Sequence, residues 1–193
     1  EISACQAYCW ALHGTYQGTI MCSNRAIDGG FGTAEVYNNL AIAYLRDAKL
    51  ESALVALNEA IGQDEAFQEA LHNRACLEFR RAKQKGRPVD NRARLDIEAA
   101  IKIGPPTATL YLDAARIYSL LGQEPREYRE RVVEYLCEAL RLGLSSDRVR
   151  KEFEPLLDDP DVAASLANCV PGEAEQPRVR LVDPLSDDFF HLP

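Results

Sequence analysis

A pattern of small and aromatic residues that recurs at an interval of 34 positions is the strongest constraint on the fold of this chain. Its clearest copy is AEVYNNLAIAYLRDAKLESALVALNEAI, residues 34–61, where two amphipathic helical patterns are joined by a short link. In this copy the first helix carries Tyr37-x2-Leu40-Ala41-x2-Tyr44 and the second carries Ala53-x3-Leu57-x2-Ala60. Alanine at such places lets two helix backbones approach closely, so the pattern predicts helical hairpins that stack on one another.

Three other segments repeat this pattern. A shift of 34 residues upstream places Ala7, Trp10 and Ala26 at the positions of Ala41, Tyr44 and Ala60. The third copy places Leu71, Arg74-Ala75 and Glu78 at the first-helix positions, and it contains an insertion, KQKGRPVDN, before Ala93-x3-Ile97-x2-Ala100. The fourth begins with Tyr111-x2-Ala114-Ala115-x2-Tyr118, turns at Gly122 and has its second helix at about 125–142, ending at Gly143. The spacing of that last helix is looser, because Ala139 falls about five residues late.

This pattern resembles the tetratricopeptide repeat, in which an aromatic residue, Leu-Gly or Leu-Ala, Tyr, Ala-x3-Phe/Leu-x2-Ala and Pro follow one another. The resemblance covers about residues 3–143. It departs from the family where Glu65 replaces the expected proline and where Glu78 replaces the tyrosine. The resemblance implies an all-α fold, a right-handed superhelix of four antiparallel helical hairpins with an open concave side.

The remainder of the chain divides into two parts. Residues 144–170 have the pattern of short helices, with Asp159-Pro160 as a helix start, and are predicted to form the polar cap that a terminal repeat requires. Residues 171–193 contain prolines and acidic residues, and we expect an extended tail. An alternative is that Val179–Leu181 or Phe189–Phe190 docks into the groove of its own chain or of a neighbour, which would also allow a homodimer through the cap or the tail.

Charge and cysteine content limit the function classes. The net charge is -8, and the segment from Leu144 onward has 11 Asp/Glu against 5 Lys/Arg, so we expect no nucleic-acid partner. Residues 74–102 hold 9 Lys/Arg against 4 Asp/Glu and are predicted to form a solvated basic patch, the alternative being contact with an acidic partner or with the chain's own acidic tail. No apolar run approaches the length of a membrane span, so no membrane association is expected. The six cysteines lack the density of a secreted scaffold, and we predict reduced, packed thiols in a cytoplasmic protein.

The resemblance implies that the first helix of each hairpin lines the concave side. Asn39 and Asn73 fall at equivalent places, and an amide carries the donor and acceptor needed to hold a peptide backbone. The guanidinium groups of the neighbouring arginines are planar and can bind carboxylates through paired hydrogen bonds. The predicted contacts with a protein or peptide ligand are Asn38, Asn39, Arg46, His72, Asn73, Arg80 and Arg116. The alternative for the asparagines is that they are solvated polar groups without a ligand.

The sequence contains no catalytic motif, so we predict neither an enzyme nor a cofactor. Cys5, Cys9 and His13 share one helical stripe, but the stripe drifts around the helix and is interpreted as packing rather than as a metal site. His72 and Cys76 are four residues apart and would suit a nucleophile pair, but both are explained as lining residues of the predicted helix. The expected function is a protein–protein interaction scaffold. The alternatives are a self-assembling module whose groove is filled by a tail, or the regulatory repeat region of a larger bacterial signalling protein.

Overall fold

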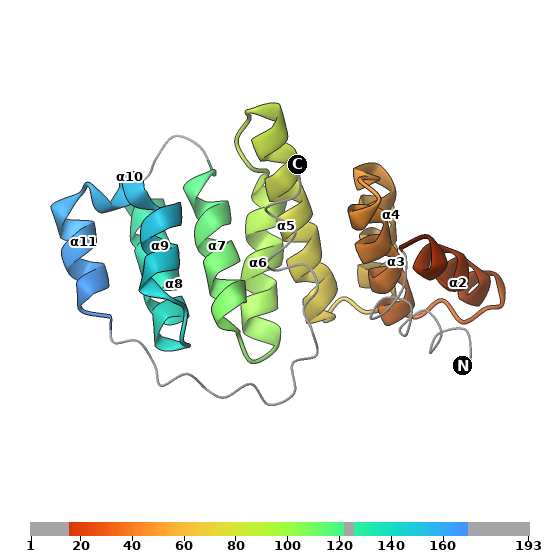
Figure 1. Cartoon of the computed structure of the whole chain (residues 1–193). Coiled ribbons are helices and arrows are strands. Elements are labelled where there is room, and N and C mark those ends of the chain that lie inside the picture. Colours follow the sequence, from red (N-terminus) through yellow and green to blue (C-terminus); the bar gives the residue numbers. More distant parts are fainter. Residues whose placement is uncertain (1–15, 122–125, 170–193) are drawn as a thin grey trace.

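The computed structural model describes residues 16–121 and 126–169, and within these ranges it contains helices joined by loops and no strand. Ten helices follow one another along a row that begins with α2 and ends with α11 (Figure 1). Each helix packs chiefly against the helices that precede and follow it in the sequence. The prediction of an all-α fold is therefore confirmed for the described residues. No helix in this part of the chain combines the length and the apolar character that a membrane crossing requires.

The first seven helices lie at the places where the recurring pattern predicts them. Their bounds are α2 Tyr16–Asp28, α3 Ala34–Arg46, α4 Leu50–Gln63, α5 Gln68–Lys85, α6 Asn91–Ile103, α7 Ala108–Ser119 and α8 Arg126–Arg141. Three of them begin at a side-chain cap: Thr33, Asp90 and Thr107 each accept a hydrogen bond from a backbone N–H of the first turn of α3, α6 and α7. The segment predicted to form the first helix of the first hairpin, with Cys5, Cys9 and His13, lies outside the described residues, as does the turn at Gly122.

The alanines of the recurring pattern are buried in the core between the helices. Ala41 of α3 and Ala53 and Ala60 of α4 are fully buried, and so are Ala93 and Ala100 of α6. A methyl group at these points allows the close approach that the sequence pattern predicts. In α8 the corresponding positions are Val132, Leu136 and Ala139, which are buried at the same x3 and x2 spacing. Within α8 the spacing of the motif is therefore kept, with valine in place of the first alanine, while the motif as a whole falls about five residues later than in the second hairpin, as the sequence indicates.

The insertion in the third hairpin lengthens a helix. Helix α5 runs for 18 residues to Lys85 and ends at Gly86, whose φ of 58° requires the left-handed conformation that glycine adopts without a steric penalty. The following loop is held against the next hairpin, because the Val89 backbone N–H donates to the Leu120 carbonyl at 2.9 Å and the Val89 side chain is buried.

Three short helices follow the repeats: α9 Ser146–Glu152, α10 Glu154–Leu157 and α11 Pro160–Ala167. The predicted start of α11 is confirmed, since Asp159 caps it and Pro160 occupies its first turn. A disulfide joins Cys137 of α8 to Cys169, which follows α11. The expectation of reduced thiols was therefore wrong for this pair. The two cysteines are 32 residues apart in the sequence, so only the packing of α11 against α8 reveals them as partners. Among the described residues, Cys22 and Cys76 are buried thiols that form no disulfide.

Candidate functional site

Helices α3, α5 and α7, the first helices of successive hairpins, also pack against one another, as α3 with α5 and α5 with α7. We call these three helices the first-helix layer. All seven residues predicted to contact a ligand belong to it: Asn38, Asn39 and Arg46 lie on α3, His72, Asn73 and Arg80 on α5, and Arg116 on α7. The structure separates them into buried and accessible groups.

The two buried asparagines of the layer bond to each other. The Asn73 side-chain N–H donates to the Asn38 Oδ1 at 2.9 Å, and the two residues are only 5% and 6% exposed. This bond links α3 to α5 and satisfies polar groups that would be costly to bury alone. The 34-residue interval makes Asn39 the equivalent of Asn73. The residue that bonds Asn73 is instead Asn38, one position earlier in α3. Asn39 is half-buried.

Four of the predicted residues retain access to solvent. Arg46 is exposed near the end of α3, and Asn39, His72 and Arg80 are half-buried. Arg46 and Arg80 are 34 residues apart and therefore occupy equivalent positions of two hairpins. Burial lowers the pKa of the Arg80 guanidinium, which marks it as a partly desolvated cation.

Arg116 belongs to a buried network that joins α5, α7 and α9. The His72 Nε2 lies 2.8 Å from the Asp113 Oδ2, and the Arg116 Nη1 donates to the Asp113 Oδ1 at 2.6 Å. Arg116 also donates three hydrogen bonds of 2.6 to 2.9 Å to the Glu152 carboxylate. The Arg148 Nε donates to Glu152 at 3.2 Å. The carboxylates of Asp113 and Glu152 thereby balance the charges of Arg116, which is 6% exposed, and Arg148.

Cys76 adds a thiol to this network. Its Sγ lies 3.5 Å from the Asp113 Oδ2, the same oxygen that the His72 ring approaches. The three potential ligand atoms of His72, Cys76 and Asp113 lie within 4.8 Å of one another. The sequence places His72 and Cys76 on one helix face, but Asp113 comes from another helix and only the packing of α5 on α7 brings it between them.

The basic stretch of residues 74–102 is partly internal. Arg74 is 7% exposed and holds Asp96 of α6 through two hydrogen bonds, with Nε–Oδ2 2.7 Å and Nη2–Oδ1 2.8 Å. Arg81 bonds Glu78 and Glu51, and Arg94 bonds Glu98. The prediction of a solvated basic patch was therefore wrong for Arg74, since that charge is neutralised within the α5–α6 hairpin.

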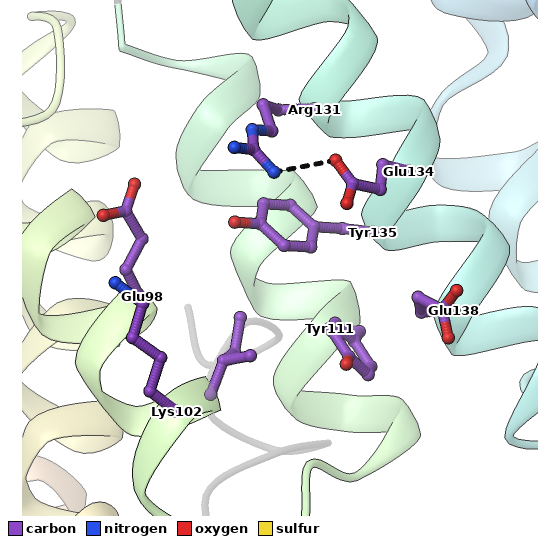
Figure 2. Close-up of a pocket in the computed structure, with 8 residues that line it drawn as sticks. Glu98, Lys102, Tyr111, Arg131, Glu134, Tyr135 and Glu138 are labelled. Carbon is purple, nitrogen blue, oxygen red and sulfur yellow. Dashed lines mark hydrogen bonds and ion pairs between the residues drawn. The ribbon is translucent and has the colours of Figure 1, made fainter.

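A surface cavity of about 340 Å³ lies between α6 and α8, over α7. Figure 2 shows Glu98 and Lys102 reaching it from α6, Tyr111 from α7, and Arg131, Glu134, Tyr135 and Glu138 from α8. Tyr111 and Tyr135 face each other with ring centroids 6.0 Å apart, and Arg131 donates to Glu134 at 2.9 Å. Nothing in the sequence pattern predicts this cavity, because its residues come from three helices and Tyr111 is interpreted as a packing residue of the repeat.

Two of the lining residues, Glu98 and Tyr135, also take part in a short chain of contacts beside the cavity. The Tyr118 hydroxyl donates to Glu98, which Arg94 also contacts at 2.9 Å, and the Tyr118 ring meets the Tyr135 ring edge-on. Burial, followed by the hydrogen bond to Glu98, raises the pKa of Tyr118 above its ordinary range. Burial also raises the pKa of Tyr135 and of Tyr111. For Glu98 burial acts in the opposite sense to the hydrogen bonds from Tyr118 and Arg94, and the net effect is a lowered pKa.

Comparison with known proteins finds no family model that matches the chain and no curated protein with a matching sequence.

Proposed function

We propose that this chain is a protein-interaction module that holds a peptide or a segment of a partner protein against the first-helix layer. The proposal includes the finer fold, a right-handed superhelix of tetratricopeptide-like hairpins whose concave side is formed by α3, α5 and α7. The observation that carries it is the mutual packing of these alternate helices, which gathers polar residues from equivalent positions of different hairpins on one layer.

The buried and accessible residues have different roles in this proposal. Asn38 and Asn73 link α3 to α5 through an internal hydrogen bond. Arg116 links α7 to α9 and bonds Asp113 of its own helix, so all three residues have structural roles. Asn39, Arg46 and Arg80 are the contacts offered to a ligand. Two guanidinium groups at equivalent positions favour an extended ligand that carries carboxylates. Each planar guanidinium can donate two parallel hydrogen bonds to one carboxylate.

The test uses the full chain and an array of acidic and basic peptides of equal length. We expect the chain to retain acidic peptides, and the triple variant Asn39→Ala, Arg46→Ala, Arg80→Ala to lose at least tenfold in affinity, about 1.4 kcal/mol. The control is Arg25→Ala with Arg141→Ala, which removes two exposed charges from α2 and α8 outside the layer. Equal binding by the triple variant and the wild type would place the ligand elsewhere.

A second function is favoured by charge. Residues 171–193 carry five Asp/Glu against two Arg, so the tail of the chain is itself a ligand of the kind that Arg46 and Arg80 would attract. In that case the module regulates its own groove or assembles with a neighbour. Deletion of residues 171–193 should then raise the affinity for acidic peptides. A light-scattering mass that falls by half on deletion would assign the tail to a neighbouring copy, whereas unchanged affinity and mass would support an open receptor groove.

A further inference from the structure

We infer that His72, Cys76 and Asp113 form a binding site for a zinc ion at the buried edge of the first-helix layer. The site goes beyond peptide binding and does not depend on it. It rests on the tertiary contact of α5 with α7, which places an imidazole, a thiol and a carboxylate around one point.

The distances match a small ion. His72 Nε2 lies 2.8 Å and Cys76 Sγ 3.5 Å from Asp113 Oδ2, and all three ligand atoms lie within 4.8 Å of one another. In a tetrahedral zinc site with bonds of about 2.0 to 2.3 Å, ligand atoms stand about 3.3 to 3.8 Å apart. The distances between the ligand atoms in the structure lie on both sides of this interval of about 3.3 to 3.8 Å. An ion therefore requires side-chain adjustments of less than about 1 Å and no movement of a helix.

The donor set selects the metal. A thiolate and an imidazole are ligands of zinc and of the softer transition metals, whereas Mg²⁺ and Ca²⁺ require several oxygen ligands. A Zn²⁺ ion, the Cys76 thiolate and the Asp113 carboxylate together have zero net charge, which lowers the cost of burying the site. Binding converts the Cys76 thiol to a thiolate, and its proton passes to the solvent.

The neighbouring residues hold the carboxylate in place. Arg116 donates to the Asp113 Oδ1 at 2.6 Å, which leaves Oδ2 directed to His72 and Cys76. Arg116 is in turn fixed by Glu152 of α9 through three hydrogen bonds. Such outer-shell contacts orient ligands in metal sites. The His72 side chain is 12% exposed, so it forms the side of the site nearest to solvent, and a water molecule can complete the coordination as the fourth ligand.

The experiment titrates the full, non-reduced chain with Zn²⁺ alone and, in parallel, with Co²⁺, whose absorption reports bonding to a thiolate. We expect one ion per chain and a thiolate-to-cobalt charge-transfer band. Cys76→Ala should abolish the charge-transfer band. His72→Ala should weaken Zn²⁺ binding by at least about 100-fold, because a direct ligand contributes at least as much as an outer-shell contact, whose loss costs up to about 100-fold. Cys22→Ala, which removes the other buried thiol that the structure describes outside the disulfide, should leave the cobalt band and the Zn²⁺ affinity unchanged.

Two results would overturn the site. One is the absence of stoichiometric zinc from a chain whose circular dichroism shows that it is folded. The other is an undiminished cobalt band in Cys76→Ala, because the thiolate would then come from a different cysteine. Circular dichroism of each variant separates loss of a ligand from loss of the fold. Since Cys76→Ala replaces one small side chain with another, we expect it to remain helical.

Discussion

Arg74 shows how one residue can depart from the repeat without breaking it. The equivalent position of the second hairpin is Leu40, and the position of its partner Asp96 is Ala56; both Leu40 and Ala56 are buried. The third hairpin has therefore exchanged an apolar pair for an ion pair at the same crossing. A buried pair stabilises little compared with a well-packed apolar pair, but loss of one member leaves an uncompensated charge.

This contrast predicts the behaviour of two variants. Asp96→Ala should lower the free energy of unfolding by about 3 to 5 kcal/mol, because Arg74 stays buried without its carboxylate. Arg74→Leu combined with Asp96→Ala copies the second hairpin and should recover most of that loss. Urea denaturation of both variants measures the difference. A double variant as unstable as the single one would mean that the two hairpins pack differently at this crossing.

The hydrogen bond between Tyr118 and Glu98 makes the stability of the fold depend on pH. Burial and the hydrogen bond to Glu98 raise the pKa of the Tyr118 hydroxyl in the folded chain above its value of 10.0 in the unfolded chain. The folded state therefore holds this proton more tightly, so its contribution to stability is complete below about pH 10 and is lost as the pH rises further.

We predict that the free energy of unfolding of the wild type falls between about pH 8 and about pH 10.5, and that Tyr118→Phe shows a smaller fall. At the lower pH the variant should be less stable by about 1 kcal/mol, since Glu98 loses a hydrogen-bond donor. Tyr16→Phe, an exposed hydroxyl removed from α2, is the control and should follow the wild type. A variant with the full alkaline fall would show that other groups cause it.

At the scale of elements, the last helices are short and depend on their attachments. Helix α11 has eight residues and α10 has four, lengths at which an isolated helix is not stable in water. Val162 and Leu166 of α11 are buried in the same core cluster as Val132 and Leu136 of α8. The disulfide from Cys137 to Cys169 closes this attachment covalently.

Removal of the disulfide should therefore loosen the end of the chain. Loop-closure entropy for a separation of 32 residues predicts a loss of about 3 to 4 kcal/mol for Cys137→Ser with Cys169→Ser, or on reduction. Amide hydrogen exchange should increase in residues 160–167 more than in α3 and α4. Cys22→Ala controls for loss of a cysteine without loss of a bridge. Unchanged exchange in α11 would show that packing alone secures it.

At the scale of the whole molecule, the buried residues of the part that the structure describes form two core clusters. The first contains side chains of α3, α4 and α5, such as Leu40, Leu57 and Leu77. The second runs from α5 to α11 and contains Ile97, Leu112 and Leu136 among others. Ile61 of α4 packs against both. Because each helix contacts mainly its neighbours, the effect of a core mutation should remain near its site.

Two matched core variants test this locality. Leu57→Ala and Leu136→Ala each remove a fully buried leucine and should cost about 2 to 5 kcal/mol. Hydrogen exchange should rise chiefly in α3 and α4 for the first variant and in α7 and α8 for the second. If either variant accelerated exchange equally in all helices, the chain would be a single cooperative unit.

The sequence was most informative where a local rule fixes the structure. Capping residues such as Thr33 and Thr107 mark helix starts by themselves, and the alanine spacing identifies the helix crossings because only a small side chain fits there. These features determined the helices and their pairing. The resemblance to the tetratricopeptide repeat, in turn, assigned all seven predicted ligand contacts to α3, α5 and α7.

Contacts between residues distant in the sequence were decided by the tertiary structure. The Asn38–Asn73 bond, the meeting of Asp113 with His72 and Cys76, the Cys137–Cys169 disulfide and the cavity over α7 each join different helices. Helical periodicity assigns a residue to a face, but the rotation and offset of two packed helices decide which polar atoms lie within hydrogen-bonding distance. By itself, then, the sequence determined the order of the helices and the small residues at their crossings. The packing of the helices decided which side chains form buried hydrogen-bond networks and which stay accessible to solvent, because burial is a property of the assembled helices.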